Sequence, residues 1–335
     1  MAAPRHSSPS SSFGSSRGSL PKSFSSPEPA SSPLAALATL LRRSRRARLI
    51  ALIAPALLII GIFMLLPIGL MAYVSLLERG VNGGVQWGVH TVDAYVAFLF
   101  EENLLGELAI NPDYLQIFAR SFTLSFVTTA ACLAIGFPAA FYMALQPAKY
   151  RNLLIFLVTI PFWTNLLVRN YAWILLLRSN GLVNESLMGL GLIDEPVTLL
   201  YTNFAIALGL VYTFLPFMVL PIYASLEKLD LRLVEAAFDL GANKRRAFQR
   251  VIVPLALPGI AAGCILVFVP SLGAFITPEL LGGSKSMMIG NLIQSQFGAA
   301  RNWPLGAALA FALLSIVLLA MTLYLMRFRR PPGTG

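Results

Sequence analysis

The chain has 335 residues, of which 57% are hydrophobic and only 12% charged, and its mean hydropathy is +0.73. Soluble domains carry about 25% charged residues, so this composition excludes a water-soluble fold and makes the lipid bilayer the solvent for most of the chain. The net charge of +10 does not indicate nucleic-acid binding, because the basic residues lie at the ends of apolar runs rather than in a basic domain.

The N-terminal segment, residues 1–41, is rich in serine and proline, with SSPSSSFGSS and SSPEPASSP as samples. Such a composition buries too little apolar area to offset chain entropy, so we predict a disordered tail. The basic run RRSRRAR at 42–48 follows, and then an uncharged run begins. That run is too long for a signal-peptide core, which indicates a retained membrane span.

Six apolar segments each reach the roughly 20 residues that a helix needs to cross a hydrocarbon core of about 30 Å. They show no alternation of period two, so a β-barrel is not expected. We predict an all-α membrane protein with six transmembrane helices, forming one domain over 42–330. The predicted spans are about 49–77, 121–146, 152–177, 199–225, 252–277 and 304–326.

The distribution of basic residues predicts the orientation of these helices. With the N-terminus in the cytoplasm, the inner segments 42–48, 149–151, 228–250 and 327–330 hold sixteen Lys and Arg residues. The outer segments hold five. The positive-inside rule therefore places both termini in the cytoplasm. The acidic residues show the reverse distribution, with ten on the outer side.

Residues suited to chemistry are scarce. Cys132 and Cys264 lie inside apolar runs, and the two histidines are far apart, so we expect neither a disulfide framework, a metal site nor a cofactor. The segment GGSKS at 282–286 lacks the Gly-Lys-Ser/Thr order of a nucleotide-binding loop. We therefore do not expect an enzyme.

The third predicted span and the loop after it each contain one feature that leads to a further prediction. Arg169 interrupts the third span, and a straight helix from residue 152 places it about 25 Å across, where it can snorkel or pair with an outer carboxylate. The segment GLVNESLMGLGLIDEP at 181–196 is expected to form a short helix between turns.

The loop at 227–251, between the fourth and fifth spans, is unusually polar. Asp230 is placed to cap a short helix, and Gly241 suits the left-handed position that ends it. A second, basic helix is expected from Lys244 to Val251, with Pro254 after it. Small apolar residues beside acidic ones suit docking into a groove on a partner protein. A helix lying on lipid headgroups explains the basic half equally well.

The segment EAAFDLGANKRRAFQRVIVPL resembles the EAA motif of permease subunits of bacterial ABC importers. The family pattern is Glu-Ala-Ala, three residues, Gly, nine residues, Ile, one residue and Leu-Pro. Here Val251 and Val253 replace Ile and Leu, which are conservative changes. The other positions match at Glu235, Ala236, Ala237, Gly241 and Pro254.

Further segments, at 161–196 and 210–230 and in ITPELLGGSKSMMIGNLI and RNWPLGAALA, resemble the spermidine/putrescine subgroup. The resemblance implies a type I importer permease in the bacterial inner membrane, paired with a second permease. Its other implied partners are two ATPase subunits and a periplasmic polyamine-binding protein. The five EAA positions would couple the permease to the ATPase, and Glu235 is the residue whose loss we expect to uncouple transport.

A path for a polycation is expected to offer carboxylates, hydroxyls and aromatic faces. Candidate residues are Glu279, Trp163, Tyr171, Trp173 and Tyr212, although aromatic residues in membrane helices commonly serve packing. Three alternatives stay open: an ABC permease for ferric ion, thiamine or phosphonate-type compounds, a secondary transporter, and a membrane scaffold. Nearly charge-free spans disfavour the second, and Gly/Pro-rich spans disfavour the third.

Overall fold

The computed structural model describes residues 45–102, 108–230, 232–283 and 286–328, so the predicted tail at 1–41 lies outside the described residues. The chain divides into two compact units, Met1–Leu65 and Leu66–Gly335. Helix α2 (Arg45–Val74) contributes to both. In the first unit its large side chains, such as Leu57 and Phe63, are exposed, as suits a helix surrounded by lipid.

Five described helical segments are long and apolar enough to cross a bilayer. Two are helix α8 (Asn203–Leu226) and a segment of helix α14 (Trp303–Phe328). A third, helix α4 (Pro112–Ala144), begins before the predicted start at 121. The prediction of an all-α membrane protein is confirmed, and its spans number six if one bent pair of helices counts as a single span. The five segments are Leu52–Val74, Pro112–Ala144, Asn203–Leu226, Lys244–Leu272 and Trp303–Leu323.

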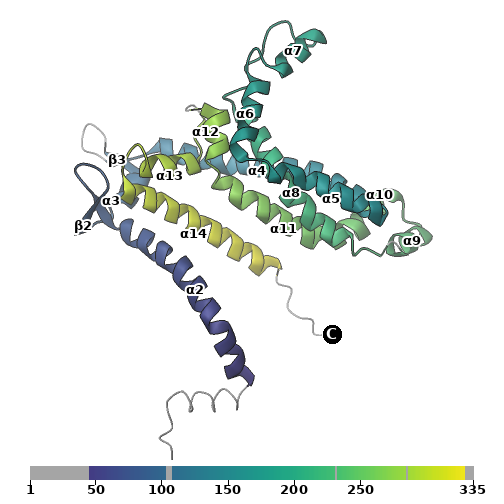
Figure 1. The fold of residues 1–335 in the computed structure, drawn as a ribbon, viewed down its shortest axis with the longest axis horizontal. Coiled ribbons are helices and arrows are strands. Elements are labelled where there is room, and N and C mark those ends of the chain that lie inside the picture. Colours follow the sequence, from purple (N-terminus) through teal and green to yellow (C-terminus); the bar gives the residue numbers. More distant parts are fainter. Residues whose placement is uncertain (1–44, 103–107, 231, 284–285, 329–335) are drawn as a thin grey trace, which may run out of the picture. The chain divides into compact units, whose positions relative to one another are not determined.

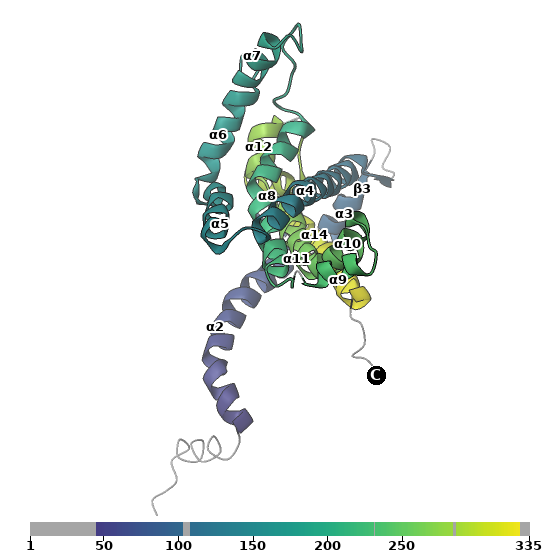
Figure 2. The same cartoon turned by 90° about the vertical axis from the view of Figure 1, so that its right-hand side faces the viewer.

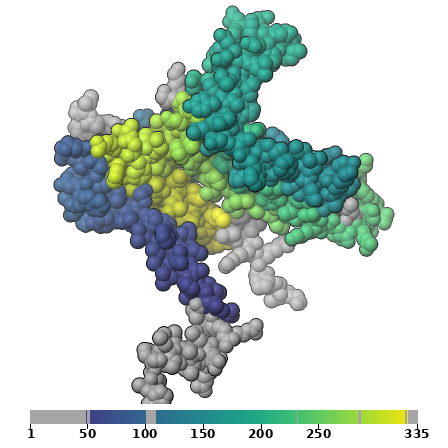
Figure 3. All heavy atoms as spheres, in the orientation of Figure 1, coloured from purple at the N-terminus to yellow at the C-terminus, as the bar shows by residue number. Residues whose placement is uncertain are grey.

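The bent pair occupies the region where the sequence predicts an unbroken span over 152–177. Helix α5 (Ala148–Trp163) ends before Thr164, and helix α6 (Leu166–Leu177) starts a new direction. The two directions differ by 88°. Figures 1 and 2 show α6, with the short helix α7 (Leu182–Gly189), extending away from α4 and α8. The two helices form the teal protrusion in Figure 3. Helix α7 confirms the expected short helix.

The core of the second unit lies where α4, α8 and α11 (Val253–Leu272) pack together. Met218 of α8 is fully buried between two glycines of its neighbours. A β-carbon on Gly136 of α4 would lie 3.1 Å from the Met218 side chain, and one on Gly263 of α11 would lie 2.8 Å from its sulfur. Small residues thus allow the close helix approach that van der Waals packing in a membrane requires.

The segment between α2 and α4 contains two short hairpins that the sequence reading did not predict. Hairpin β1–β2 is held to the segment before α14, because Arg79 donates a hydrogen bond to the Ala300 carbonyl (3.1 Å) and the Gly84 N–H donates to the Arg301 carbonyl (2.7 Å). The elements here are β1 (Leu77–Arg79), β2 (Val85–His90), α3 (Asp93–Leu99), β3 (Phe100–Glu102) and β4 (Leu108–Ile110). Both hairpins are antiparallel.

The remaining elements lie in the loops that flank α11. Before it come α9 (Arg232–Asp239), α10 (Lys244–Ala247) and a π-helical turn, η1 (Phe248–Ile252). After it come α12 (Ile276–Gly282) and α13 (Ile289–Phe297). In Figure 1, α9 and α10 lie at one end of α8 and α11, and α12 lies at the other.

The contact between α8 and α11 yields a stability prediction. A β-carbon on Gly259 would collide with the Pro221 carbonyl and lie 2.5 Å from the Ser225 hydroxyl. Gly259→Ala should therefore destabilise the protein by about 1–3 kcal/mol, despite the better helix propensity of alanine. Gly61→Ala is the matched control, because no described atom lies within 4 Å of its added β-carbon. Thermal unfolding in detergent should show a lower Tm for the first variant only, and equal Tm values would contradict this packing.

Candidate functional site

The loop between α8 and α11 forms the two helices that the sequence predicts at its ends. The Asp230 carboxylate accepts a hydrogen bond from the Arg232 N–H (3.0 Å) as α9 begins, which confirms the predicted cap. Gly241 has a φ of +80°, which confirms its left-handed position. Its N–H donates to the Phe238 carbonyl (2.9 Å), and the Ala242 N–H donates to the Ala237 carbonyl (2.9 Å). This pair of bonds is the Schellman ending of a helix.

Helix α9 holds to the bundle by one side and leaves an apolar stripe uncovered. Val234 packs against the core cluster that includes Leu226 and Ile252. On another face and two turns apart, Leu233 is 50% and Leu240 88% exposed, with Ala236 exposed between them. An uncovered stripe of this kind suits burial against a second surface.

The acidic and small residues of the EAA motif lie on and beside this stripe. Glu235 is exposed and makes no hydrogen bond or ion pair with another described residue. Ala236 is exposed and Ala237 half-buried. Between the end of α9 and the following helix lies a pocket of about 240 Å³, lined by Ala237 and Gly241 on one side and by Arg246 on the other. The pocket brings a small apolar surface close to two arginines, Arg246 and Arg250.

The second predicted helix, Lys244 to Val251, is present, but it is α-helical only over α10 and continues as the π-helical turn η1. Asn243 caps α10 by accepting a hydrogen bond from the Arg246 N–H (2.9 Å), and then the π-helical turn η1 leads into α11. Pro254 lies in the first turn of α11. A proline lacks the N–H and clashes with the carbonyl four residues earlier, and one wider turn before it accommodates that clash.

The π-helical turn also attaches the loop to α4. The Phe248 ring lies edge-on to the rings of Phe137 (5.6 Å between centroids) and Phe141 (6.4 Å). Aromatic contacts of this kind are specific in geometry and add to the burial of the rings. A displacement of the loop is therefore resisted by α4 as well as by α11.

A second candidate site is a pocket of about 440 Å³ where the α5–α6 bend faces α8 and the end of α11. Most of its wall is apolar or aromatic, with threonine hydroxyls and one arginine. Phe162 of α5 and Phe217 of α8 meet edge-on there, 5.4 Å between centroids. Its aromatic, hydroxyl and charged lining residues include Phe162, Thr164, Arg169, Thr213, Phe217 and Phe275.

The structure corrects the expectation for Arg169. The straight helix on which its position at the outer interface depends is broken at Thr164, so the distance count does not apply. Arg169 instead lines the pocket. Its Nη1 donates to the Pro161 carbonyl (2.8 Å), and its guanidinium lies over the Tyr212 ring, 5.7 Å from the centroid.

The other residues predicted for a substrate path occupy different places. Trp163 (82% exposed) and Tyr171 (56% exposed) do not line the pocket. Trp173 and Tyr212 form an edge-to-face pair with centroids 5.7 Å apart, behind Arg169. The five candidates are therefore not brought together in one site.

Glu279 lies on α12, whose first two residues, Ile276 and Thr277, line the pocket. Its carboxylate is exposed and accepts a hydrogen bond from Asn291 (2.7 Å). Asn291 is only 3% exposed and also donates to the Phe275 carbonyl (2.8 Å). A buried amide thus orients an exposed carboxylate beside the pocket.

The sequence reading missed the phenylalanines that form the pocket wall. They come from three separate segments, so no local pattern collects them. A signal did exist in the third segment: Pro161 followed by Thr164 and Asn165, residues that end one helix and cap the next. Asn165 does cap α6, accepting a hydrogen bond from the Leu167 N–H (2.8 Å).

Comparison with protein-family models matches residues 133–330 to the binding-protein-dependent transport system inner membrane component family. The chain belongs to this family. The matched region contains the EAA loop and the residues that line the pocket. The protein is therefore a multi-pass component of an inner-membrane transport system.

Relatives among characterised proteins cover most of the same length. The spermidine/putrescine transport system permease protein PotB of Escherichia coli K12 is 42% identical over 263 residues, 78% of this chain and 91% of the relative. The protein of the same name from Haemophilus influenzae is 43% identical over 262 residues, 78% of this chain and 87% of the relative. The E. coli inner membrane ABC transporter permease protein YdcU is 36% identical over 281 residues, 79% and 88% of the two chains.

A solved structure agrees in fold. A chain of a bacterial ABC transporter involved in the import of the acidic polysaccharide alginate superposes with a TM-score of 0.64 at 18% identity. The match covers 88% of this chain and 100% of that chain. The helical arrangement is thus that of an ABC importer permease, as the sequence predicts.

The left-handed turn at Gly241 yields a prediction about the loop. Gly241→Val should strain the turn and open it, because a β-branched residue disfavours a φ of +80°. Gly241→Asn is the matched control, since asparagine tolerates this region. Limited trypsin digestion should cut the valine variant faster at Lys244 to Arg246 than the parent or the asparagine variant. Equal cleavage of all three would show that the turn does not depend on glycine.

Proposed function

We propose that the chain is the permease subunit of an ATP-driven importer of polyamines such as putrescine and spermidine. The observation that carries the proposal is the 42% identity to a spermidine/putrescine permease over 91% of that protein's length. In this proposal the subunit provides the translocation path. The energy comes from the ATPase subunits, since the chain itself supplies binding surfaces and motion rather than reaction chemistry.

The proposed partners are two ATPase subunits, a second permease, a periplasmic polyamine-binding protein and the surrounding lipid. The exposed stripe on α9 supports ATPase docking, because its apolar residues and the unengaged Glu235 suit a groove with a basic residue. Closure of an ATPase dimer would then move α9 toward the loop of the second permease.

The proposed orientation places both termini and α9 in the cytoplasm. The described inner residues support it, since Arg232, Lys244, Arg245, Arg246 and Arg250 all belong to the α9–α11 loop. Glu279 and the α12–α13 region then face the outside, at the end of the bundle opposite α9 (Figure 1).

The pocket beside the α5–α6 bend suits a passing cation through aromatic faces and hydroxyl oxygens. No carboxylate is found among the described residues that line it, so the oriented Glu279 is the proposed first contact for an ammonium group. Arg169 keeps its positive charge in the pocket wall, and that charge favours an anionic cargo such as a phosphonate. Its Nη1 donates to the Pro161 carbonyl and its guanidinium lies over the Tyr212 ring, so the group is held against the wall.

The first functional prediction concerns Glu235. Uptake of radiolabelled putrescine and spermidine, in cells depleted of other polyamine carriers, should require this protein and collapse in Glu235→Ala. The physical reason is the loss of a charged contact to the ATPase without any change in the fold, since the side chain is exposed. Membrane levels of the protein should stay equal.

Glu185→Ala is the matched control, because it removes an exposed helix carboxylate from α7. It should leave uptake unchanged. Uptake indifferent to the protein would refute the polyamine cargo and direct the same assay to ferric ion, thiamine or phosphonates. Uptake that survives Glu235→Ala would refute the coupling role.

The second functional prediction concerns Glu279. Glu279→Gln keeps an acceptor for Asn291 but removes the negative charge, so the KM for uptake should rise about two- to fivefold, the range expected for an exposed charge contact. The maximal rate should change little. Initial-rate measurements over a range of spermidine concentrations test this, and an unchanged KM would remove Glu279 from the proposed path.

A further inference from the structure

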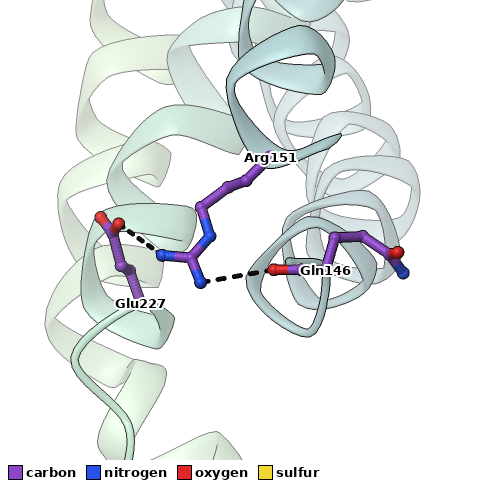
Figure 4. Close-up of polar contacts among 3 residues, drawn as sticks. All are labelled: Gln146, Arg151 and Glu227. Atoms are coloured by element: carbon purple, nitrogen blue, oxygen red, sulfur yellow. Dashed lines mark hydrogen bonds and ion pairs between the residues drawn. The ribbon is translucent and has the colours of Figure 1, made fainter. Parts of the chain in front are cut away.

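Arg151 joins three helix ends at the base of the α8–α9 loop (Figure 4). Its Nη1 donates to the Glu227 carboxylate at 2.8 Å, and its Nη2 donates to the Gln146 backbone carbonyl at 3.3 Å. Arg151 lies in the first turn of α5, Gln146 follows the end of α4, and Glu227 caps the end of α8. One guanidinium therefore holds the start of α5 against the residue from which the loop to α9 departs.

Helix α5 has few other anchors. All of its residues are described, and none is buried. Leu154, Ile155 and Val158 lie partly buried against the core that α4 and α8 share. At its far end, Phe162 contacts Phe217. Such a helix can slide or tilt on its neighbours more easily than α4, α8 or α11, so the polar tie at its start has a large influence on its position.

The two ends of α5 belong to the two candidate sites. Its 16 residues span about 24 Å at 1.5 Å per residue. One end is tied to Glu227, three residues before the cap of α9 at Asp230. The other end carries Phe162 into the pocket wall, just before the bend. A rigid helix that connects these points can carry a displacement from one to the other.

The ion pair keeps its charges at neutral pH. Hydrogen bonds from the Tyr223 hydroxyl and from Arg151 lower the pKa of the Glu227 carboxyl below its ordinary value. Glu227 has 44% and Arg151 26% of its side chain exposed. A partly exposed pair of this kind adds little to folding stability, so its removal should leave the fold intact.

We propose that Arg151 is a positioning residue that transmits movement of the α8–α9 loop through α5 to the pocket wall. The inference rests on the proposed function, in which α9 receives the movement of the ATPase. When the loop root shifts, the Arg151–Glu227 pair pulls the start of α5 with it, and Phe162 moves at the other end. Without the pair, α9 and the ATPase move while α5 lags behind. ATP is then hydrolysed with little transport.

The test uses the whole transporter, with both permeases, the ATPase and the binding protein, reconstituted in lipid vesicles. Four quantities are measured for each variant: spermidine uptake, ATP hydrolysis, ATPase binding and Tm. In Arg151→Gln and in Glu227→Gln, uptake per ATP should fall about fivefold or more, while ATP hydrolysis and Tm stay near the parent values. The exchanged pair, Arg151→Glu with Glu227→Arg, should recover a large part of the lost ratio. Lys149→Gln is the matched control, because it removes a positive charge from the same turn and leaves the pair intact.

The outcomes distinguish a failure of the role of Arg151 from a failure of the proposed coupling of α9 to the ATPase. An unchanged ratio in Arg151→Gln, while Glu235→Ala abolishes ATPase binding, overturns the role of Arg151 alone. Loss of ATPase binding and a lower Tm in Arg151→Gln would mean a merely structural role and also overturn it. Equal loss in the exchanged pair and the single variants would deny that the pair acts as a unit. If Glu235→Ala keeps ATPase binding and transport, the proposed coupling function itself fails.

Discussion

Helices α8 and α11 approach so closely that a β-carbon at Gly259 or Gly263 would collide with α8, and the other contacts of the second unit depend on this approach. In a bilayer, apolar side chains gain nothing by leaving lipid for protein, so helices associate through tight packing and occasional polar contacts. Met218, fully buried between Gly136 and Gly263, shows the consequence: α4, α8 and α11 share one dense core. The core is a dense frame, and α5, none of whose residues is buried, lies at its edge.

The sites form where the frame ends and the backbone must find new partners. A broken helix in a membrane is tolerated only if its freed polar groups are satisfied. At the α5–α6 bend, the Pro161 carbonyl accepts hydrogen bonds from both Thr164 (2.8 Å) and Arg169 (2.8 Å). Beyond α11, Asn291 satisfies the Phe275 carbonyl and holds Glu279 with the same amide. Thr164 and Arg169, which satisfy the Pro161 carbonyl at the bend, are therefore also part of the pocket lining.

The sequence predicts two kinds of feature: membrane spans, which follow from the lipid solvent, and helix caps and turns, which depend on neighbouring residues. Long apolar runs indicate spans because lipid leaves a helix few alternatives, and Asp230 and Gly241 act within a few residues of themselves. The 88° bend is a different matter, since apolar residues continue on both sides and hydropathy does not register a change of direction. The misplacement of Arg169 follows directly from that missed bend. The sequence also does not predict the strands between Leu77 and Ile110, because strands of three to six residues carry too little pattern.

The chemistry of the pocket fits a subunit that passes its cargo on. Tight recognition of a polycation needs several carboxylates, and release from such a site is slow because each must be rehydrated. Aromatic faces and hydroxyls attract an ammonium group more weakly. The described pocket lining contains aromatic rings, threonine hydroxyls and Arg169, which donates a hydrogen bond to the Pro161 carbonyl. The carboxylate of Glu279, held by Asn291, lies beside the pocket rather than in it. In the proposed function, selection then occurs outside the membrane, on a binding protein, and the permease contributes a path whose shape would follow the ATPase. If the contacts along the path are weak, transport depends on whether α5 moves together with the loop at Glu227. The partly exposed Arg151–Glu227 pair would then affect transport more than it affects folding stability.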